Sequence, residues 1–411
     1  MRISSGRAAE AQVRKLAARS TQLDAVEAPV RRIVNDVRKH GDVALRKYAK
    51  RWDGLGEKDS IQVSDLTTAW GTSAPEFKSA LKQAAANIRQ FCEWQKPKEW
   101  RRSSKGISLG QLVRPLESVG CYVPGGRYPL VSTLLMTVIP AQVAAVKNIR
   151  VVSPQPRPEV LAAAGMLGIT EFYRVGGAQA IAALAYGTQS IPRVDKIVGP
   201  GNTYVTAAKK LVSFDCAIDM LAGPTEVLIL SDNGDASFIA SDLVAQSEHD
   251  PETLAIFITT SKNLAKAIVA KATAMSATNA IATKSLSANG QVLIAASRKQ
   301  AQDWANQIAP EHITADAADI PHIRNAGSVF VGGYSPQAAG DYAVGPNHVL
   351  PTAGAARFRG GLSVLDFVKL ITVQELSNQG LKKIAPVVEL LATTEGLTAH
   401  AESVRVRRAN A

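Results

Sequence analysis

The spacing of apolar residues divides the chain into a helical beginning, a long alternating middle and a helical end. Over residues 1–100, apolar positions recur three and four apart, as at Val30, Ile33 and Val34. This spacing predicts amphipathic helices. From about Ile107 onward, short strand-like runs lead into a loop that is rich in proline and glycine, which is typical of a change to sheet structure.

From residue 132 onward, predicted helices and strands alternate regularly. The helices are predicted at 132–146, 158–167, 178–187, 203–212, 236–249, 263–275 and 299–309. The strands are predicted at 148–154, 171–175, 195–200, 226–232, 253–260, 291–297 and 327–333. Because these strands are apolar along most of their length, we expect them to be buried on both faces in parallel sheets that are covered by the helices.

The alternation predicts an α/β fold with two Rossmann-like parallel-sheet domains. We expect residues 1–105 to be a helical region packing on the first domain, 106–222 to be that domain, 223–364 the second domain, and 365–411 a C-terminal helical tail. The two successive units suggest a duplication, although their sequences are not recognisably repeated. No Gly-x-Gly-x-x-Gly fingerprint follows a predicted strand. The residues alone therefore permit a dinucleotide cofactor without requiring one.

The charge raises nucleic-acid binding as an alternative. The net charge is +12 and the pI is about 9.6, values that suit a polyanionic partner. The basic residues are dispersed, however, and aromatic residues make up only 5% of the chain, so the stacking platforms of nucleic-acid-binding proteins are not evident. We therefore expect no nucleic-acid partner.

Cysteine usage and hydropathy indicate the compartment. Cys92, Cys121 and Cys216 have no C-x-x-C spacing, which favours a reducing environment. The basic N-terminal segment lacks the apolar core of a signal peptide. The longest apolar stretch contains Pro140 and is shorter than the ~20 residues of a membrane span. We expect a cytoplasmic protein with no membrane partner.

Two pairs of residues are candidates for chemistry. Gln246 and His249 lie three apart on a predicted helix and therefore share one face, with Pro251 ending the helix just after them. Glu311 and His312 are neighbours, which in a strand would point to opposite faces, so sharing a site requires a turn at this point. Histidine beside a carboxylate is a natural general-base pair. Taken alone, the first pair is more often an exposed polar helix end, and the second is more often part of a surface loop.

The segment 332–354 is a long loop punctuated by glycine and proline, and it carries Asp341 and His348. Long loops of this kind are usually functional. Further glycine-rich points occur in the sequences YVPGGRYP, RVGGAQA and VGPGNTY. The last two follow a predicted strand and precede a helix, where backbone N–H groups are able to hold an anion.

Taken in order, the motifs of the chain resemble those of the histidinol dehydrogenase family over nearly its whole length. The motifs are YVPGGRYPL, RVGGAQAIAALAYGT, VGPGNTYV, AGPTEVLILSD, SDLVAQSEHDP, APEHI, GDYAVGPNHVLPTAG, GLSVLDFVK, TVQELS and EGLTAH. So many motifs in one order are far more specific than any one of them.

The resemblance implies the residues of an active site. The family's catalytic pair falls on Glu311 and His312. Its Zn²⁺ ligands, one ion per subunit, fall on Gln246, His249, Asp341 and His400. Its substrate contacts fall on Thr225, His348 and Glu395, together with His312 and the four metal ligands. Its NAD⁺ contacts fall on Tyr122, Gln179 and Asn202.

The resemblance further implies a function: zinc-dependent oxidation of L-histidinol by two NAD⁺, through the aldehyde, to L-histidine, the last steps of histidine biosynthesis. Family members are homodimers whose C-terminal tail, here carrying Glu395 and His400, reaches the partner's site. Pro346 and Thr314 depart from the usual motifs, which bears on substrate choice. The alternatives are a relative that oxidises another small alcohol, such as a sulfonated diol, and a nucleic-acid-binding protein without activity.

Overall fold

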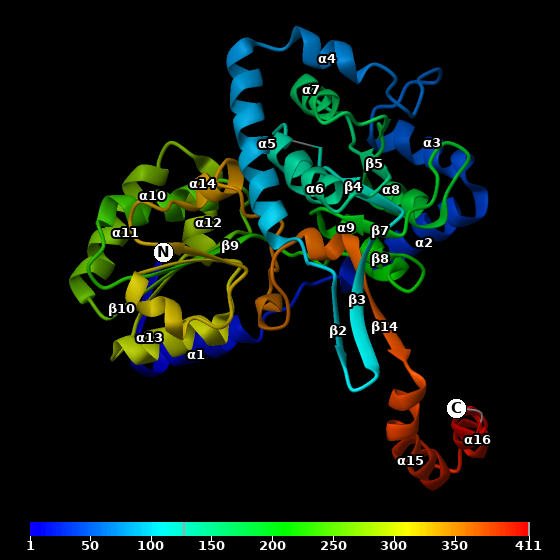
Figure 1. The fold of residues 1–411 in the computed structure, drawn as a ribbon. Helices are drawn as coiled ribbons and strands as arrows, with labels where there is room; N and C mark the ends of the chain where they lie inside the picture. The colour runs from blue at the N-terminus through cyan, green and yellow to red at the C-terminus, as the bar shows by residue number, and fades with distance from the viewer. Residues whose placement is uncertain (126–127, 410–411) are drawn as a thin grey trace.

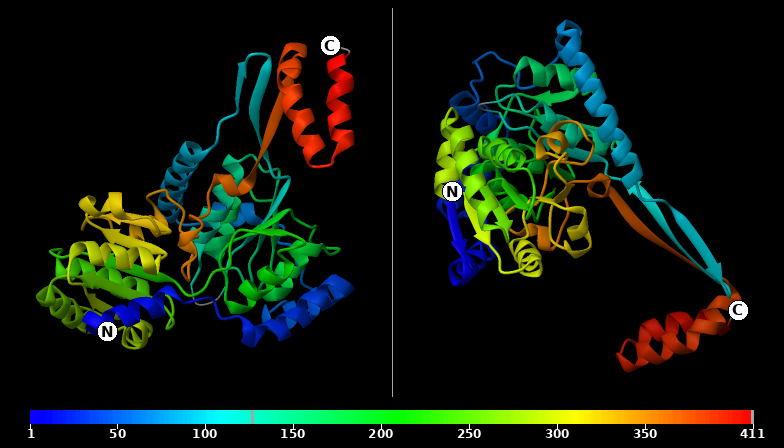
Figure 2. Two further views of the ribbon diagram at one scale, coloured as in Figure 1. Left: turned by 90° about the horizontal axis from the view of Figure 1, so that it is seen from below. Right: turned by 90° about the vertical axis from the view of Figure 1, so that its left-hand side faces the viewer.

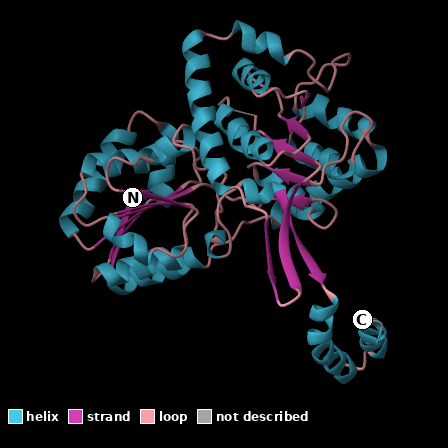
Figure 3. Cartoon of the chain, in the orientation of Figure 1, coloured by secondary structure: helices cyan, strands magenta, loops and turns pink. Residues whose placement is uncertain are grey.

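The computed structural model describes residues 1–125 and 128–409. It consists of two α/β units that lie side by side, and of a three-stranded ribbon that projects from them and leads to a helical tail (Figure 1). The α/β class expected from the alternating pattern is confirmed: each unit is built on a parallel sheet with helices on both faces (Figure 3).

The first unit is built on a five-stranded parallel sheet with the order β6-β5-β4-β7-β8. Its strands are β4 (Ser118–Tyr122), β5 (Asn148–Val152), β6 (Glu171–Tyr173), β7 (Lys196–Val198) and β8 (Ala217–Ile218). One face is covered by α2 (Asp24–His40), α3 (Asp42–Trp52), α8 (Gly177–Tyr186) and α9 (Thr203–Val212). The other face is covered by α4 (Leu66–Thr72), α5 (Pro75–Gln95), α6 (Val131–Val143) and α7 (Pro158–Met166).

The second unit is built on a six-stranded parallel sheet with the order β1-β11-β10-β9-β12-β13. Its strands are β1 (Arg2–Ser5), β9 (Glu226–Leu230), β10 (Leu254–Thr259), β11 (Gln291–Ile294), β12 (His312–Ala315) and β13 (Ser328–Val331). One face packs on α10 (Ala236–Ser247), α11 (Lys262–Ser276) and α12 (Ala280–Asn289), and the other on α1 (Gly6–Ala17) and α13 (Arg298–Ile308).

Both sheets have the strand order of a Rossmann fold. Numbered within its own unit, each sheet runs 3-2-1-4-5, and the second sheet adds β1 at its edge. The strand order of each sheet therefore reverses beside its first strand, at β4 and at β9. Such a reversal opens a crevice in which α/β proteins bind ligands.

The first residues of the chain depart from the expected packing. β1 pairs in parallel with β11, and α1 packs against α13. Residues 2–17 thus belong with the second unit, although the whole of 1–105 was expected to pack on the first. Residues 2–5 form too short and too polar a strand (RISS) to be recognised by apolar alternation.

The beginning of the C-terminal segment is a strand and not a helix. β14 (Val368–Leu376) pairs antiparallel with β3 (Ile107–Pro115), which also pairs with β2 (Trp100–Ser104). The expectation of helix throughout 365–411 is therefore wrong for this stretch. Its β-branched and apolar residues find a partner only in β3, which lies about 260 positions earlier in the chain. Beyond β14, α15 (Asn378–Thr394) and α16 (Thr398–Ala409) form the tail, which stands clear of both units (Figure 2).

The remaining elements are short. They are α14 (Gln337–Tyr342) and the 3₁₀ turns Ala317–His322, Ala355–Arg357 and Val364–Phe367. Among the helices of the described ranges, none combines the length and the apolarity that a bilayer span requires. Cys92, Cys121 and Cys216 are free and buried.

Candidate active site

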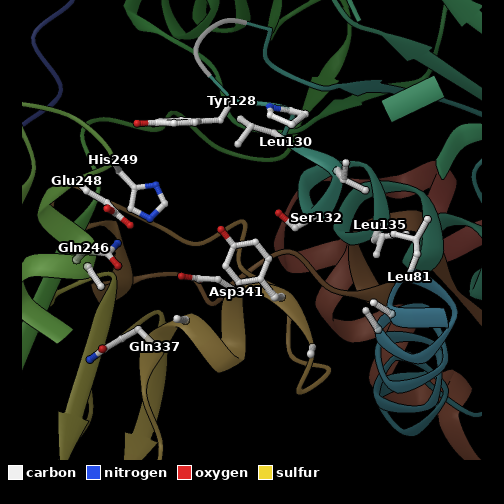
Figure 4. A pocket seen from close by; sticks show the side chains of 18 of the residues that line it. Leu81, Tyr128, Leu130, Ser132, Leu135, Gln246, Glu248, His249, Gln337 and Asp341 are labelled. Atoms are coloured by element: carbon white, nitrogen blue, oxygen red, sulfur yellow. The ribbon is translucent and has the colours of Figure 1, made fainter. Parts of the chain in front are cut away.

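A cavity of about 570 Å³ lies between the two units. Its walls come from α5 and α6 of the first unit and from α10 and α14 of the second. Figure 4 shows Gln246 and His249 on one side of this space and Asp341 opposite them, with its carboxylate directed towards that side. The cavity therefore joins segments that are up to about 270 residues apart in the chain.

The chain turns sharply just before the predicted catalytic pair. Ala309, which follows α13, has a left-handed backbone (φ 51°), and Pro310 and Glu311 precede the first residue of β12, His312. Because Glu311 lies in the turn and only His312 in the strand, the two side chains approach each other. Glu311 Oε2 lies 3.6 Å from His312 Nδ1. This is the turn that a shared site requires.

Glu311 is held in place by two donors. The Thr225 hydroxyl donates to Glu311 Oε2 over 2.6 Å, and the backbone N–H of Glu226 donates to the same oxygen over 2.8 Å. Burial raises the pKa of Glu311 to about 7, although the neighbouring His312 and both donors oppose the rise. A carboxyl group whose pKa is near neutral is suited to exchange a proton with water.

His312 has one occupied and one unoccupied ring nitrogen. Nδ1 lies 3.1 Å from the backbone oxygen of Glu226, and Nε2 lies 3.5 Å from Asp341 Oδ1. Within the described part of the chain, buried Nε2 has no hydrogen-bond partner. Burial would lower the pKa of His312, but the carboxylates of Glu311 and Asp341 outweigh it and raise the pKa to about 9. The ring is thus oriented with one nitrogen open.

Gln246 and His249 stand at the end of α10. The helix ends at Ser247, so His249 lies just beyond it, and its N–H still reaches Gln246 O over 3.3 Å. Gln246 Nε2 donates to Thr225 Oγ1 over 2.6 Å, which leaves the amide oxygen as the atom available to a ligand. An amide oxygen, an imidazole and the carboxylate of Asp341 are donors that Zn²⁺ accepts.

Three ligands are fewer than the four that Zn²⁺ usually takes from a protein or its substrate. Across residues 1–125 and 128–409, no three His, Cys, Asp or Glu side chains gather closely enough to hold a metal ion by themselves. The residues present in one chain therefore fit part of a zinc site, and a fourth ligand is still needed.

His400 and Glu395 do not reach this cavity within one chain. Glu395 caps the end of α15, His400 lies in the first turn of α16, and both are exposed. The ribbon and tail carry them away from the two units, as both views of Figure 2 show. The structure thus places these two predicted residues apart from the others.

His348 adjoins the catalytic pair. Its Nδ1 lies 2.8 Å from the backbone oxygen of Asp341, and its Nε2 lies 3.4 Å from the Thr133 hydroxyl. Burial lowers the pKa of His348, which favours a neutral ring. Together with Thr225 and Glu311 it lines a small cavity of about 110 Å³ that also includes Gly199 and Pro200.

A second large cavity, of about 450 Å³, lies at the carboxyl ends of the first sheet. Tyr122 ends β4, Gln179 lies in the first turn of α8, and Asn202 caps α9 by accepting from Val205 N over 3.1 Å. The Tyr122 hydroxyl accepts from Gly177 N over 3.1 Å. All three predicted cofactor residues line this cavity, and Gly199 and Pro200 lie between it and Glu311.

One residue of the first cavity was not predicted from the sequence. Asp242 lines the wall one helical turn before Gln246, on the same face of α10. Burial raises its pKa to about 6. The spacing Asp242–Gln246–His249 was the signal available, but an aspartate on a helix face is more often solvated than functional.

Known proteins resemble the chain over nearly its full length. The sequence profile of the histidinol dehydrogenase family matches residues 16–408. Relatives described as histidinol dehydrogenase are 45% identical over 97% of this chain and 95% of the relative in Methanosarcina barkeri, and 44% identical over 93% of each in Listeria monocytogenes. A solved histidinol dehydrogenase from Elizabethkingia anophelis superposes with a TM-score of 0.94, at 36% identity, over 99% of this chain and 98% of that one.

The two Rossmann-like sheets and these relatives define the class of protein: an NAD-dependent oxidoreductase that acts on CH–OH groups. Within that class, the chain belongs to the histidinol dehydrogenase family. The family expected from the order of the motifs is thereby confirmed.

Proposed function

We propose that the protein oxidises L-histidinol through L-histidinaldehyde to L-histidine, with reduction of two NAD⁺ and with one Zn²⁺ per subunit, as the last steps of histidine biosynthesis. The observation that carries the proposal is the buried pair of Glu311 and His312, whose open Nε2 lies beside the wall formed by Gln246, His249 and Asp341. The family membership supports the choice of substrate.

His312 acts as the base in both oxidations. Its Nε2 accepts the hydroxyl proton of the substrate while hydride leaves the carbinol carbon for the nicotinamide ring of NAD⁺. Because Nδ1 is fixed against the Glu226 carbonyl, the ring holds Nε2 in a constant direction. A proton that arrives on His312 is stabilised by the carboxylates of Glu311 and Asp341.

Glu311 prepares the second oxidation. A water molecule adds to the aldehyde carbon while Glu311 accepts one of its protons and the protonated His312 returns its proton to the carbonyl oxygen. The hydrated aldehyde then stands ready to lose hydride, and His312 is again neutral. The donors Thr225 and Glu226 hold the carboxylate, and its pKa of about 7 allows it to take up and release a proton near neutral pH.

Gln246, His249 and Asp341 would hold the zinc ion, and His400 of a second subunit would complete the ligand set. When bound, the ion orients the substrate's nitrogen atoms and polarises its reacting group. The residues of this chain set its position: Gln246 is fixed through Thr225, and Thr225 is in turn bonded to Glu311. Two hydrogen bonds through the Thr225 hydroxyl therefore link Gln246, in the wall that would hold the metal, to the catalytic carboxylate of Glu311.

A homodimer brings the tail into a neighbouring site. The ribbon and tail expose a set of large apolar side chains, each at least 44% exposed: Leu109, Leu370, Ile371, Leu376, Val387, Leu390, Leu391 and Leu397. Apolar surface on a projecting arm is typical of an interface between subunits. We place Glu395 beside the substrate's ammonium group and His400 on the metal of the partner. The free, buried cysteines fit a reducing cytoplasm.

The test is metal-dependent NADH formation from L-histidinol. We expect two NADH per histidinol consumed, loss of activity after removal of metal by a chelator, and recovery when Zn²⁺ is returned. Dihydroxypropanesulfonate serves as the comparison substrate. No NADH from histidinol, or a higher kcat/KM for the sulfonated diol, would overturn the proposal.

A further inference from the structure

A buried carboxylate lies in the wall of the cavity at the first sheet. Asp53 directly follows α3 and is only 7% exposed. Its Oδ2 accepts two hydrogen bonds, from Gly176 N and from Gln179 Nε2, both over 3.0 Å. Burial raises the pKa of Asp53, and the two N–H donors oppose that rise. Its other oxygen, Oδ1, makes no hydrogen bond with the described residues and remains available to a ligand.

Asp53 stands at the tip of the second strand of the Rossmann-like sheet. Gly176, to which it is bonded, packs so closely on Pro154 that an added Cβ would lie 2.4 Å from Pro154 Cγ. Gly54 likewise adjoins Gln155. Pro154 and Gln155 follow directly after β5. In Rossmann folds, an acidic residue at this place binds the 2′-hydroxyl of the adenosine ribose.

The segment after β5 itself supplies no acid, because it reads Ser153-Pro154-Gln155. The carboxylate comes instead from the N-terminal helical region, about 100 residues earlier in the chain. Asp53 also fixes Gln179, so that one carboxylate both lines the cavity and positions a neighbouring residue predicted to contact the cofactor. A search for the standard fingerprint therefore passes over it.

The charge of the described part of the cavity lining is one-sided. Its described lining consists of Ile33, Trp52, Asp53, Tyr122, Gly125, Pro154, Gln155, Gly177, Ala178, Gln179, Asn202 and Tyr204. Of these residues, Asp53 alone carries a charge, and no lysine or arginine is among them. A ribose hydroxyl donates to a carboxylate, whereas a 2′-phosphate at the same place is repelled and finds no cation among these residues.

We propose that Asp53 selects NAD⁺ over NADP⁺ by accepting a hydrogen bond from the adenosine ribose through Oδ1 and by repelling a 2′-phosphate. The inference rests on the proposed function to the extent that the cavity lined by Tyr122, Gln179 and Asn202 binds the coenzyme. It adds a residue that determines which coenzyme is used.

The test compares the two coenzymes in Asp53→Asn. We expect the ratio of kcat/KM for NAD⁺ to kcat/KM for NADP⁺ to fall by about 10- to 100-fold, as for the loss of one charged hydrogen bond. Asp65→Asn is the matched control, because Asp65 caps α4, accepts from Thr68 N and lies outside the cavity. An unchanged ratio in Asp53→Asn, or an equal fall in the control, would contradict the inference.

Binding without turnover separates selectivity from structure and from the overall reaction. Calorimetry with ADP-ribose and 2′-phospho-ADP-ribose needs no histidinol, so it tests Asp53 even if the protein fails to oxidise that substrate. We expect Asp53→Asn to bind ADP-ribose more weakly and 2′-phospho-ADP-ribose more tightly than the unaltered protein does. An equal loss of affinity for both ligands would show that Asp53 has only a structural role and would refute its selection of NAD⁺ over NADP⁺.

A second variant, Gln155→Arg, tests the inference if Asp53→Asn does not fold, as judged by circular dichroism. This variant leaves the buried contacts of Asp53 unchanged. Gln155 is exposed at the rim of the same cavity. A guanidinium there supplies the missing cation for a 2′-phosphate, and we expect the same ratio to fall about 10-fold. No change in that variant would also count against the assignment.

Discussion

At the scale of single residues, the site depends on a few atoms that are kept out of water. Glu311 and His312 are both buried, and each perturbs the proton affinity of the other. Burial gives the Glu311 carboxyl a higher pKa in the folded protein, about 7, than in the unfolded chain, 4.5. The folded state therefore loses stability as the pH rises from 4.5 towards 7, because the charged carboxylate is favoured by the unfolded chain. Such a cost is typical of catalytic groups.

Glu311→Gln should separate the two oxidations. We expect oxidation of the aldehyde to fall by at least about 100-fold and oxidation of the alcohol to fall much less, because only the aldehyde step needs the carboxylate to activate water. In the unaltered protein, kcat/KM for the aldehyde should rise with pH through about 7, as Glu311 loses its proton. The variant should lack that rise. Stopped-flow measurement of NADH with each substrate checks both, and equal losses would disprove the role.

At the scale of elements, a buried ion pair holds the loop between the two cavities. Lys209 of α9 donates to Gly199 O over 2.9 Å and pairs with Asp219, which accepts from Gly199 N over 2.7 Å. Lys209 and Asp219 are 2% and 5% exposed. Gly199 has a φ of 113°, and an added Cβ would meet the Tyr122 backbone oxygen at 2.2 Å. The pair thus fixes the loop that separates the predicted coenzyme residues from Glu311.

Lys209→Met should destabilise the fold by about 3–5 kcal/mol, because it leaves the Asp219 charge buried without its partner. The neighbouring Lys210→Met is the matched control: Lys210 pairs with Glu27 on the surface, and such a pair contributes about 0–1 kcal/mol. Equilibrium unfolding in urea measures both changes. Similar losses in the two variants would show that the Lys209 pair contributes no more than a surface pair.

At the scale of the whole molecule, the proposed dimer assigns the tail of one subunit to the site of the other. Gln246, His249 and Asp341 line one cavity, whereas Glu395 and His400 lie on the projecting tail. A site completed by a second subunit gives a clear expectation for mixed dimers. It also requires His400→Ala to lose zinc, although His400 is remote from the cavity in its own chain.

Two variants that have each lost oxidation of the aldehyde should therefore restore that step in each other. In a dimer of His400→Ala with Glu311→Gln, one site receives both defects and the other receives none. Random exchange of subunits should recover about one quarter of the normal rate of aldehyde oxidation per site, since half of the dimers are mixed and each has one intact site. Activity assays and zinc analysis after exchange check this expectation. Absence of recovery, despite mixed dimers shown by mass spectrometry, would place each site within one chain.

The sequence by itself determined most of the helices and strands of the two units. Apolar periodicity is a local property, and segments such as Val131–Val143 and Glu226–Leu230 carry it strongly. The order of the motifs was enough to indicate the family, and through the family the pairing of Glu311 with His312. Pro310 by itself only made a turn at this point plausible. None of these inferences needed contacts between distant segments.

Only the tertiary structure decided how distant segments meet. The pairing of β1 with β11 and of β14 with β3 depends on partners far away in the chain, and short or exposed strands carry little local signal. The place of Asp53 at the tip of β5, and the distance of His400 from Asp341, have the same origin. Periodicity reports which face of an element is buried, but the fold alone determines what that face is buried against.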